Sequence, residues 1–271
     1  MGMKWLQSII YGFVSGISEL LPISSSAHQK LLLKLFGVDR GDPILNLLVH
    51  IAILVAVYFN CKNLIQQTGF NLPGQAASRR RHSGQNFDRR FVKSASIAFC
   101  IVTVLVTYIF KGNYSLANVA VFSLINGIVL FVSGRALMGN KNAKSMSALD
   151  SAATGVLGAL SVLPGISRTA MTLSVPGFRG ADRENALNWT LLISIPALAV
   201  MILMDFVDMF AGVPGMPFVT YLGYLLAAGA AYVGAYCAIY VLRLLTARTG
   251  YSGFAFYSWG VSLFSFILYL I

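Results

Sequence analysis

Long apolar segments separated by short polar ones dominate the pattern of this chain. A membrane-spanning helix needs about 20 predominantly apolar residues, so segments of this length without Asp, Glu, Lys or Arg predict transmembrane helices. Six segments qualify or nearly qualify: 44–61, 94–110, 112–134, 185–204, 217–242 and 249–271. The pattern therefore predicts an all-α polytopic membrane protein with six transmembrane helices.

Two further apolar segments, residues 5–18 and 151–163, are too short to span a bilayer comfortably. Each leads into a polar segment that contains proline: LLPISSSAH at 20–28 and LPGISRTAMT at 163–172. Proline ends a helix, and irregular polar backbone is tolerated at membrane depth only inside the protein or beside a wet cavity. We therefore expect two re-entrant helix–loop–helix hairpins, over residues 4–34 and 149–182.

An internal repeat relates the two halves of the chain, 1–140 and 141–271. Each half is expected to hold one hairpin followed by three spans. Because three is odd, the second half would insert upside down, which is the inverted-topology repeat of many transporters. The alternative is a chance similarity between two loops that contain Ser and Pro. Five positions are identical at an offset of 142 residues: Leu21 with Leu163, Pro22 with Pro164, Gly16 with Gly158, Ser25 with Ser167 and Asn46 with Asn188.

The distribution of charge predicts orientation in a membrane and no nucleic-acid partner. Only 11% of the residues are charged, whereas a soluble domain is about one quarter charged. The net charge is +11, and seven Lys and Arg residues lie in the segment 62–93, which is expected to be a cytoplasmic loop. The expected outer loop, 205–216, carries Asp205 and Asp208 instead. Both termini are then expected outside.

Few ionisable residues lie in the predicted membrane region, and most belong to the hairpins. Such residues are costly inside a membrane and mark a functional site by default. The first hairpin holds Glu19 and His28, which can activate a nucleophile, bind a divalent cation or protonate a leaving group. The second holds Arg168, whose planar guanidinium matches phosphate oxygens. Together they point to a phosphorylated lipid as substrate.

Plainer interpretations of the same residues stay open. Glu19 and Arg168 can neutralise each other without a ligand. The hairpin serines can serve as packing contacts between helices. His50, in the middle of the first span, is expected to be a hydrogen-bonded interior residue.

Two segments carry a resemblance to a known family. GFVSGISELLPISSSAH at 12–28 and LPGISRTAMT at 163–172 resemble the signature segments of the undecaprenyl-diphosphate phosphatase family of bacitracin-resistance membrane proteins, and the similarity extends over 44–59 and 182–200. The resemblance implies a hydrolase that removes the terminal phosphate of undecaprenyl diphosphate at the outer face of the bacterial cytoplasmic membrane. It also implies recycling of this lipid carrier for peptidoglycan synthesis, competition with bacitracin for the substrate, and a divalent cation, magnesium or calcium. The sequence leaves a homodimer open.

The resemblance also implies roles for individual residues. Glu19 matches the second glutamate of the family's acidic motif and is the candidate metal ligand, and Ser25 matches its proposed nucleophilic serine. His28 matches the essential histidine, and Arg168 matches the arginine that grips the diphosphate. The nucleophile stays open between Ser25 and His28. Further candidates for substrate binding are Ser24, Ser26, Gly165, Ser167, Thr169 and Thr172.

Three positions depart from the family pattern because they lack its usual acidic residue: Ser15, Asn46 and Asn188. Hard divalent cations prefer several oxygen ligands, so a site with one carboxylate is expected to hold such a cation weakly. Besides a phosphatase, the sequence therefore leaves two alternatives. One is a flippase that moves a polyprenyl phosphate, and the other is a protein that binds a lipid phosphate without hydrolysis.

Overall fold

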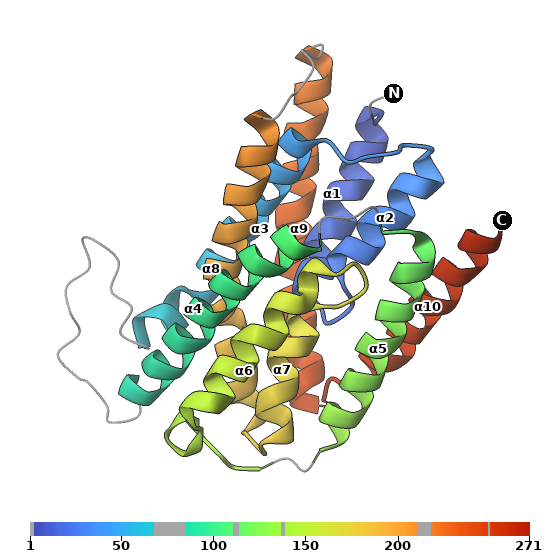
Figure 1. Cartoon of the computed structure of the whole chain (residues 1–271). Helices are drawn as coiled ribbons and strands as arrows, with labels where there is room; N and C mark the ends of the chain where they lie inside the picture. Colours follow the sequence, from blue (N-terminus) through green and yellow to red (C-terminus); the bar gives the residue numbers. More distant parts are fainter. Residues whose placement is uncertain (1–2, 68–84, 111–113, 137–138, 211–217, 249) are drawn as a thin grey trace.

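In the computed structural model, the described residues form a bundle of ten α-helices and two 3₁₀ turns (Figure 1). The structure describes residues 3–67, 85–110, 114–136, 139–210, 218–248 and 250–271. The helices are α1 (Trp5–Leu20), α2 (Ser25–Phe36), α3 (Pro43–Gln67), α4 (Gln85–Ile109), α5 (Leu116–Arg135), α6 (Ala148–Ala159), α7 (Arg168–Phe178), α8 (Arg183–Phe210), α9 (Phe218–Arg248) and α10 (Phe254–Leu270). The 3₁₀ turns are η1 (Ala143–Ser145) and η2 (Leu160–Val162).

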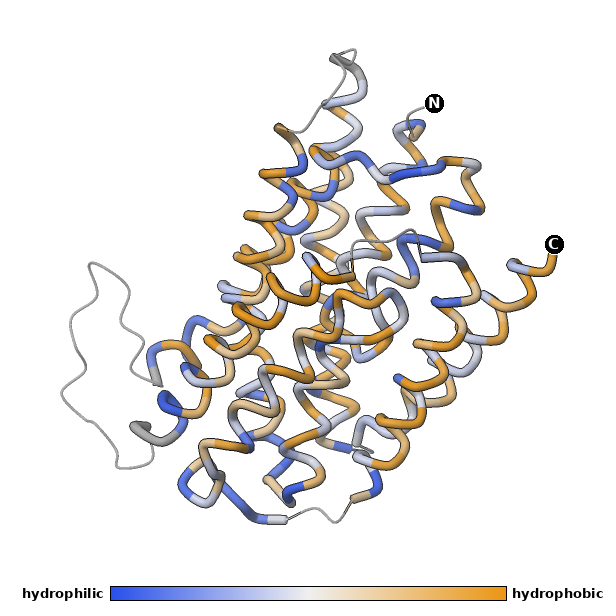
Figure 2. The backbone as a smooth tube through the Cα atoms, viewed as in Figure 1, coloured by the Kyte–Doolittle hydropathy of each residue, from blue (hydrophilic) through white to orange (hydrophobic). Residues whose placement is uncertain are grey.

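Five of these helices are long and apolar enough to cross a membrane: α3, α4, α5, α8 and α9. The sixth predicted span corresponds to α10, an apolar helix of 17 residues. Large apolar side chains face outward along the bundle, among them Ile101, Leu105 and Leu225, each more than half exposed. Figure 2 shows hydrophobic residues along the helices and hydrophilic ones gathered near many of their ends. Water-soluble proteins rarely expose such a surface, so the chain is a multi-pass membrane protein.

Two predicted loops are wrong in their bounds. Helices α3 and α4 continue into the segment 62–93 from both sides, and residues 68–84 lie outside the described residues. The predicted outer loop 205–216 is also too long, since Asp205 and Asp208 belong to α8. The apolar length of a span reflects the thickness of the hydrocarbon layer. Backbone hydrogen bonds can continue a helix beyond the hydrocarbon layer, so hydropathy alone predicts these helices too short.

Two helix–loop–helix units enter the bundle from opposite ends. The first hairpin consists of α1, α2 and their turn 21–24, and the second consists of α6, η2, α7 and the turn 163–167. In Figure 1 the two turns face each other inside the bundle. A serine caps the helix that follows each turn. The Ser24 hydroxyl accepts a hydrogen bond from the Ala27 N–H at 3.4 Å. The Ser167 hydroxyl accepts one from the Ala170 N–H at 3.3 Å.

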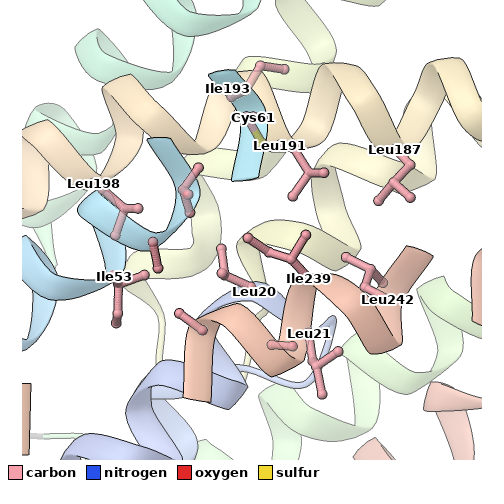
Figure 3. Close-up of a cluster of buried hydrophobic side chains, with 14 of the residues drawn as sticks. Leu20, Leu21, Ile53, Cys61, Leu187, Leu191, Ile193, Leu198, Ile239 and Leu242 are labelled. Atoms are coloured by element: carbon pink, nitrogen blue, oxygen red, sulfur yellow. The ribbon is translucent and has the colours of Figure 1, made fainter. Parts of the chain in front are cut away.

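Small residues allow α1 to lie directly against α9. A Cβ added to Gly12 would lie 2.2 Å from the carbonyl oxygen of Ala227, and one added to Gly16 would lie 2.2 Å from that of Ala231. Glycines four residues apart allow such backbone contact between membrane helices. Beside this contact, buried apolar side chains fill the bundle and fix the end of α1, among them Leu20, Leu21, Ile53, Leu187, Leu191, Leu198, Ile239 and Leu242 (Figure 3).

A Gly16→Ala substitution is expected to destabilise the protein, whereas Gly229→Ala is not. The added Cβ at Gly16 meets the Ala231 carbonyl, but a Cβ at Gly229 has nothing within 4 Å. Overpacking of this kind costs about 1–3 kcal/mol, while alanine at an open helix position favours the helix. The measurement is the midpoint of thermal unfolding in detergent. Equal midpoints for the two variants would contradict the close α1–α9 contact.

Candidate active site

Polar residues of both hairpin turns meet around a cavity of about 50 Å³, here called the hairpin cavity. Among the described residues, two charged side chains line it: Glu19 at the end of α1 and Arg168 at the start of α7. The rest of the lining is neutral and consists of Ser18, Ser25, Ser26, Gln29, Ser161, Ile166, Ser167 and Met201. The fold therefore brings five of the predicted site residues into one small polar space, three from the first hairpin and two from the second.

A buried ion pair joins the two hairpins. Arg168 Nη2 lies 3.2 Å from Glu19 Oε1, and the two side chains are 3% and 4% exposed. The other carboxylate oxygen of Glu19 accepts a hydrogen bond from the Ser25 hydroxyl. Ser25 therefore lies beside a carboxylate that can accept its proton, which is an arrangement that turns a serine into a nucleophile.

Arg168 keeps unused hydrogen-bond donors. Its Nε and Nη1 are buried and have no hydrogen-bond partner among the described residues. A buried polar group without a partner is costly, and a guanidinium readily forms two parallel hydrogen bonds with a phosphate. Helices α2 and α7 both begin at the cavity, and helix N-termini favour anions. The hairpin cavity is therefore suited to an anion with several oxygens, such as a phosphate group.

Hydrogen bonds between the two turns fix the shape of the cavity. The Gly165 N–H donates to the Ser24 hydroxyl oxygen at 3.1 Å, and the Ser167 hydroxyl donates to the Leu21 carbonyl at 3.4 Å. Both turns pass through positive φ angles, 65° at Ser24 and 119° at Gly165. Glycine adopts such angles freely, whereas serine does so only where its surroundings hold it. The first turn thus depends on its contact with the second.

His28 is held away from the hairpin cavity. Its Nδ1 lies 2.7 Å from the Ser24 carbonyl oxygen, and its Nε2 lies 2.8 Å from the hydroxyl of Tyr257 on α10, whose ring stacks on the imidazole. A carbonyl oxygen only accepts, so Nδ1 carries a proton, and in the neutral imidazole Nε2 accepts from the Tyr257 hydroxyl. Both ring nitrogens are occupied, and His28 is not among the lining residues.

The six predicted substrate-binding residues fall into three groups. Ser26 and Ser167 line the cavity. The Thr169 hydroxyl instead donates to the Glu19 carbonyl at 3.4 Å. The Thr172 hydroxyl donates to the Arg168 carbonyl at 2.9 Å. Ser24 and Gly165 form a hydrogen bond with each other across the two turns. Four of the six therefore support the cavity without lining it.

The three positions without a carboxyl group have different surroundings. Ser15 is buried, and its hydroxyl accepts a hydrogen bond from Gln29 Nε2 at 3.2 Å. Because Gln29 lines the cavity, Ser15 reaches the site through that side chain. Asn46 accepts a hydrogen bond from the Tyr11 hydroxyl at 2.9 Å, and Asn188 lies half-buried on α8. Neither asparagine is among the lining residues.

The lining of the hairpin cavity offers few charged ligands to a divalent cation. Among the described residues, no group of three or more His, Cys, Asp or Glu is placed to hold a metal ion. Glu19 offers the one carboxylate in the described lining, and Ser18, Ser26 and Gln29 offer neutral oxygens. Divalent cations need more negative charge than this set supplies. The residues fit such a cation only together with the oxygens of a bound diphosphate.

A second buried polar pair lies outside the cavity and joins α3 to α8. His50 Nδ1 lies 2.5 Å from Asp205 Oδ2, and His50 is 5% exposed. The expectation that His50 is a hydrogen-bonded interior residue is confirmed. The sequence does not reveal its partner, because Asp205 lies past the apolar segment, where hydropathy predicts a loop.

Half of the ten described lining residues are absent from the predicted site: Ser18, Gln29, Ser161, Ile166 and Met201. Tyr257, which contacts His28, is absent from it as well. Gln29 follows Ser25 by four residues, so both lie on one face of α2, and this spacing was a usable signal. Tyr257 had no such signal, because it lies 229 residues from the histidine that it contacts.

Comparison with known proteins gives a consistent result. The family model described as "Bacitracin resistance protein BacA" matches residues 8–264. An undecaprenyl-diphosphatase of Carboxydothermus hydrogenoformans is 29% identical over 272 residues, covering 95% of this chain and 94% of that protein. One of Treponema denticola is 31% identical and covers 75% and 76%. Undecaprenyl-diphosphatase 3 of Bacillus cereus is 28% identical and covers 96% of each. Since the family model covers nearly the whole chain, including both hairpin turns and every cavity residue, the chain belongs to the bacitracin resistance protein BacA family.

Proposed function

We propose that the protein hydrolyses undecaprenyl diphosphate to undecaprenyl phosphate and inorganic phosphate. Family membership and three relatives named undecaprenyl-diphosphatase support this reaction. The observation that carries it is a buried arginine with two unused donor nitrogens beside a serine–carboxylate pair. Such a set can bind a phosphate group and deliver a nucleophile to it.

In the proposed reaction, the Ser25 oxygen attacks the terminal phosphorus, and the bond from that phosphorus to the bridging oxygen breaks. Glu19 accepts the Ser25 proton and passes it to the departing undecaprenyl phosphate. Water then attacks the phosphoserine, and Glu19 transfers a proton from this water to the Ser25 oxygen as inorganic phosphate leaves. The hydrogen bond between Ser25 and Glu19 supports Ser25 as nucleophile and Glu19 as base.

Arg168 and the start of α7 are proposed to stabilise the charge on the transferring phosphoryl group. The free Nε and Nη1 donors support this role, because fixed donors in a dry site need no reorganisation during the reaction. Ser26 and Ser167 line the same cavity and are proposed to bind phosphate oxygens with their hydroxyl groups.

His28 is proposed to position the serine turn, and the occupied ring nitrogens argue against it as the nucleophile. Its Nδ1–H holds the Ser24 carbonyl, directly before Ser25. Ser24 has the positive φ of 65°, so this bond helps to hold a backbone conformation that serine rarely adopts.

We further propose that a magnesium or calcium ion binds together with the substrate. Glu19, Gln29 and the cavity serines would hold it, with the diphosphate oxygens as further ligands. The chemistry that such a cation supplies when bound is neutralisation of phosphate charge.

In the membrane, α10 is proposed as the sixth span, and the two hairpins are proposed to be re-entrant halves of an inverted repeat. Their entry from opposite ends of the bundle supports this topology (Figure 1). The end with the basic residues of α4 and α9 is proposed to face the cytoplasm of a bacterial cell, with substrate entering from the outer face of the cytoplasmic membrane. Bacitracin would then compete for the substrate there.

A polyprenyl-phosphate flippase or a lipid-phosphate binder is the alternative function. The observation that favours it is the single carboxylate in the described lining of the hairpin cavity. These alternatives predict binding or movement of the lipid without phosphate release.

Replacing Ser25 is expected to have a much larger effect than replacing its neighbour. Ser25→Ala removes the proposed nucleophile, so phosphate release should fall by about 1,000-fold or more. Ser26→Ala removes one binding hydroxyl and should cost at most about tenfold. The measurement is phosphate release from undecaprenyl diphosphate by protein purified in detergent. Similar losses in both variants would argue against Ser25 as nucleophile.

Arg168→Ala is expected to abolish phosphate release, and Arg168→Lys to retain only a small part of it. Lysine keeps the charge but lacks the planar fork of donors, so the loss should be about 10²-fold or more. Arg248→Ala, an exposed position at the end of α9, is the control and should leave the rate unchanged. Full activity of Arg168→Lys would rule out the proposed use of the guanidinium.

Ser15→Glu is expected to lower the magnesium concentration that gives half-maximal activity. The new carboxylate would stand next to Gln29 and add the negative charge that a divalent cation prefers. The measurement is phosphate release across a magnesium titration, with Ser15→Gln as the uncharged control. No phosphate release from either the natural protein or Ser15→Glu would favour the flippase or the binder.

A further inference from the structure

Helix α5 supports the turn of the second hairpin from outside both signature segments. A Cβ added to Gly165 in this turn would lie 2.8 Å from the backbone N of Ser123 and 2.8 Å from the carbonyl oxygen of Val119, both on α5. Asn126 follows on the same helix, with no exposed surface. The turn therefore rests on α5, and the side chain of Asn126 lies where the two hairpins meet.

The amide of Asn126 makes three hydrogen bonds to three different parts of the chain. Its Oδ1 accepts from the Ser167 N–H at 2.9 Å. Its Nδ2 donates to the Pro22 carbonyl at 3.1 Å and to the Ser258 hydroxyl on α10 at 3.1 Å. A rotation of the amide by half a turn would place donor against donor and acceptor against acceptor, so the contacts fix its orientation.

These bonds connect the backbones that carry the reacting groups. Pro22 follows Glu19 by three residues in the first turn, and Ser167 directly precedes Arg168 in the second. One side chain thus bridges the segment that holds the carboxylate to the segment that holds the arginine. We propose that Asn126 is a positioning residue that sets the spacing between Arg168 and the Ser25–Glu19 pair for phosphoryl transfer. This inference rests on the proposed phosphatase function.

A purely structural role for Asn126 makes a different prediction from a positioning role. If Asn126 only satisfies buried backbone groups, its replacement lowers stability and leaves the turnover of the folded protein unchanged. If it sets the spacing, a small displacement of the arginine lowers kcat, because phosphoryl transfer depends on alignment. A displaced arginine also binds the diphosphate more weakly, so KM rises in that case. The kcat and KM of the folded variant therefore separate the two roles.

The chain offers a graded series of variants. Asn126→Asp keeps the shape and the acceptor for Ser167, but an ionised carboxylate cannot donate to the Pro22 carbonyl. Ser258→Ala removes only the bond to α10. Ser123→Ala is the matched control, because this buried serine on the same helix has no side-chain partner among the described residues.

The experiment measures phosphate release from undecaprenyl diphosphate and the thermal unfolding midpoint of each variant in detergent. We expect Asn126→Asp to lower kcat by about tenfold or more and to raise KM. Ser258→Ala and Ser123→Ala should keep kcat within about twofold. An unchanged kcat for folded Asn126→Asp, or an equal loss in Ser123→Ala, would overturn the proposal. If Asn126→Asp does not fold, Asn126→Ser removes the bridge without adding charge and is judged by the same criteria.

A second readout is independent of hydrolysis. Pyrophosphate that binds the folded protein raises its unfolding midpoint. We expect this increase for the natural protein and Ser123→Ala, and a clearly smaller one for Asn126→Asp. If the natural protein binds pyrophosphate but releases no phosphate from the lipid, the proposed function fails and the role of Asn126 is still tested. An equal increase in Asn126→Asp would contradict the positioning role.

Discussion

The ion pair between Glu19 and Arg168 is the interaction on which the rest of the structure depends. Both side chains are almost fully buried, and each is delivered by a different hairpin. Two opposite charges in such surroundings are tolerable only as a pair, because removal of one leaves the other uncompensated. The pair leaves part of the guanidinium unused, so the same contact that joins the hairpins also creates a place for an anion.

Each hairpin is held in position by other parts of the bundle. The first is held by the glycine contact between α1 and α9 and by the apolar core at its tip. The second rests on α5, through close contact at Gly165 and the amide of Asn126. The supports come from spans that carry no part of the signature segments. Glu19, Ser25 and Arg168 thus lie at helix ends beside short polar turns, and the spans supply the rigidity that those turns lack.

The sequence allowed the class of fold and half of the cavity lining to be predicted, because both depend on local signals. Apolar length marks spans, and proline within a polar segment marks an interrupted helix. It could not reveal contacts between distant elements, such as Tyr257 with His28 or Asp205 with His50. It also left Ser25 and His28 as equal candidates for the nucleophile, although of these two only Ser25 lines the cavity. Side-chain direction at a turn is decided by neighbours that pattern analysis does not see.

The distance along the chain between the two hairpins affects how the site is made. Glu19 and Arg168 are 149 residues apart, so a growing chain holds the carboxylate long before it contains its partner. A lone carboxylate has no stable place in a bilayer, so it stays neutral or remains near the surface until the second turn is synthesised. Assembly of the site is therefore a late event in biogenesis. An interrupted chain carries only half of it, and the hairpin cavity is complete only when translation has passed both turns.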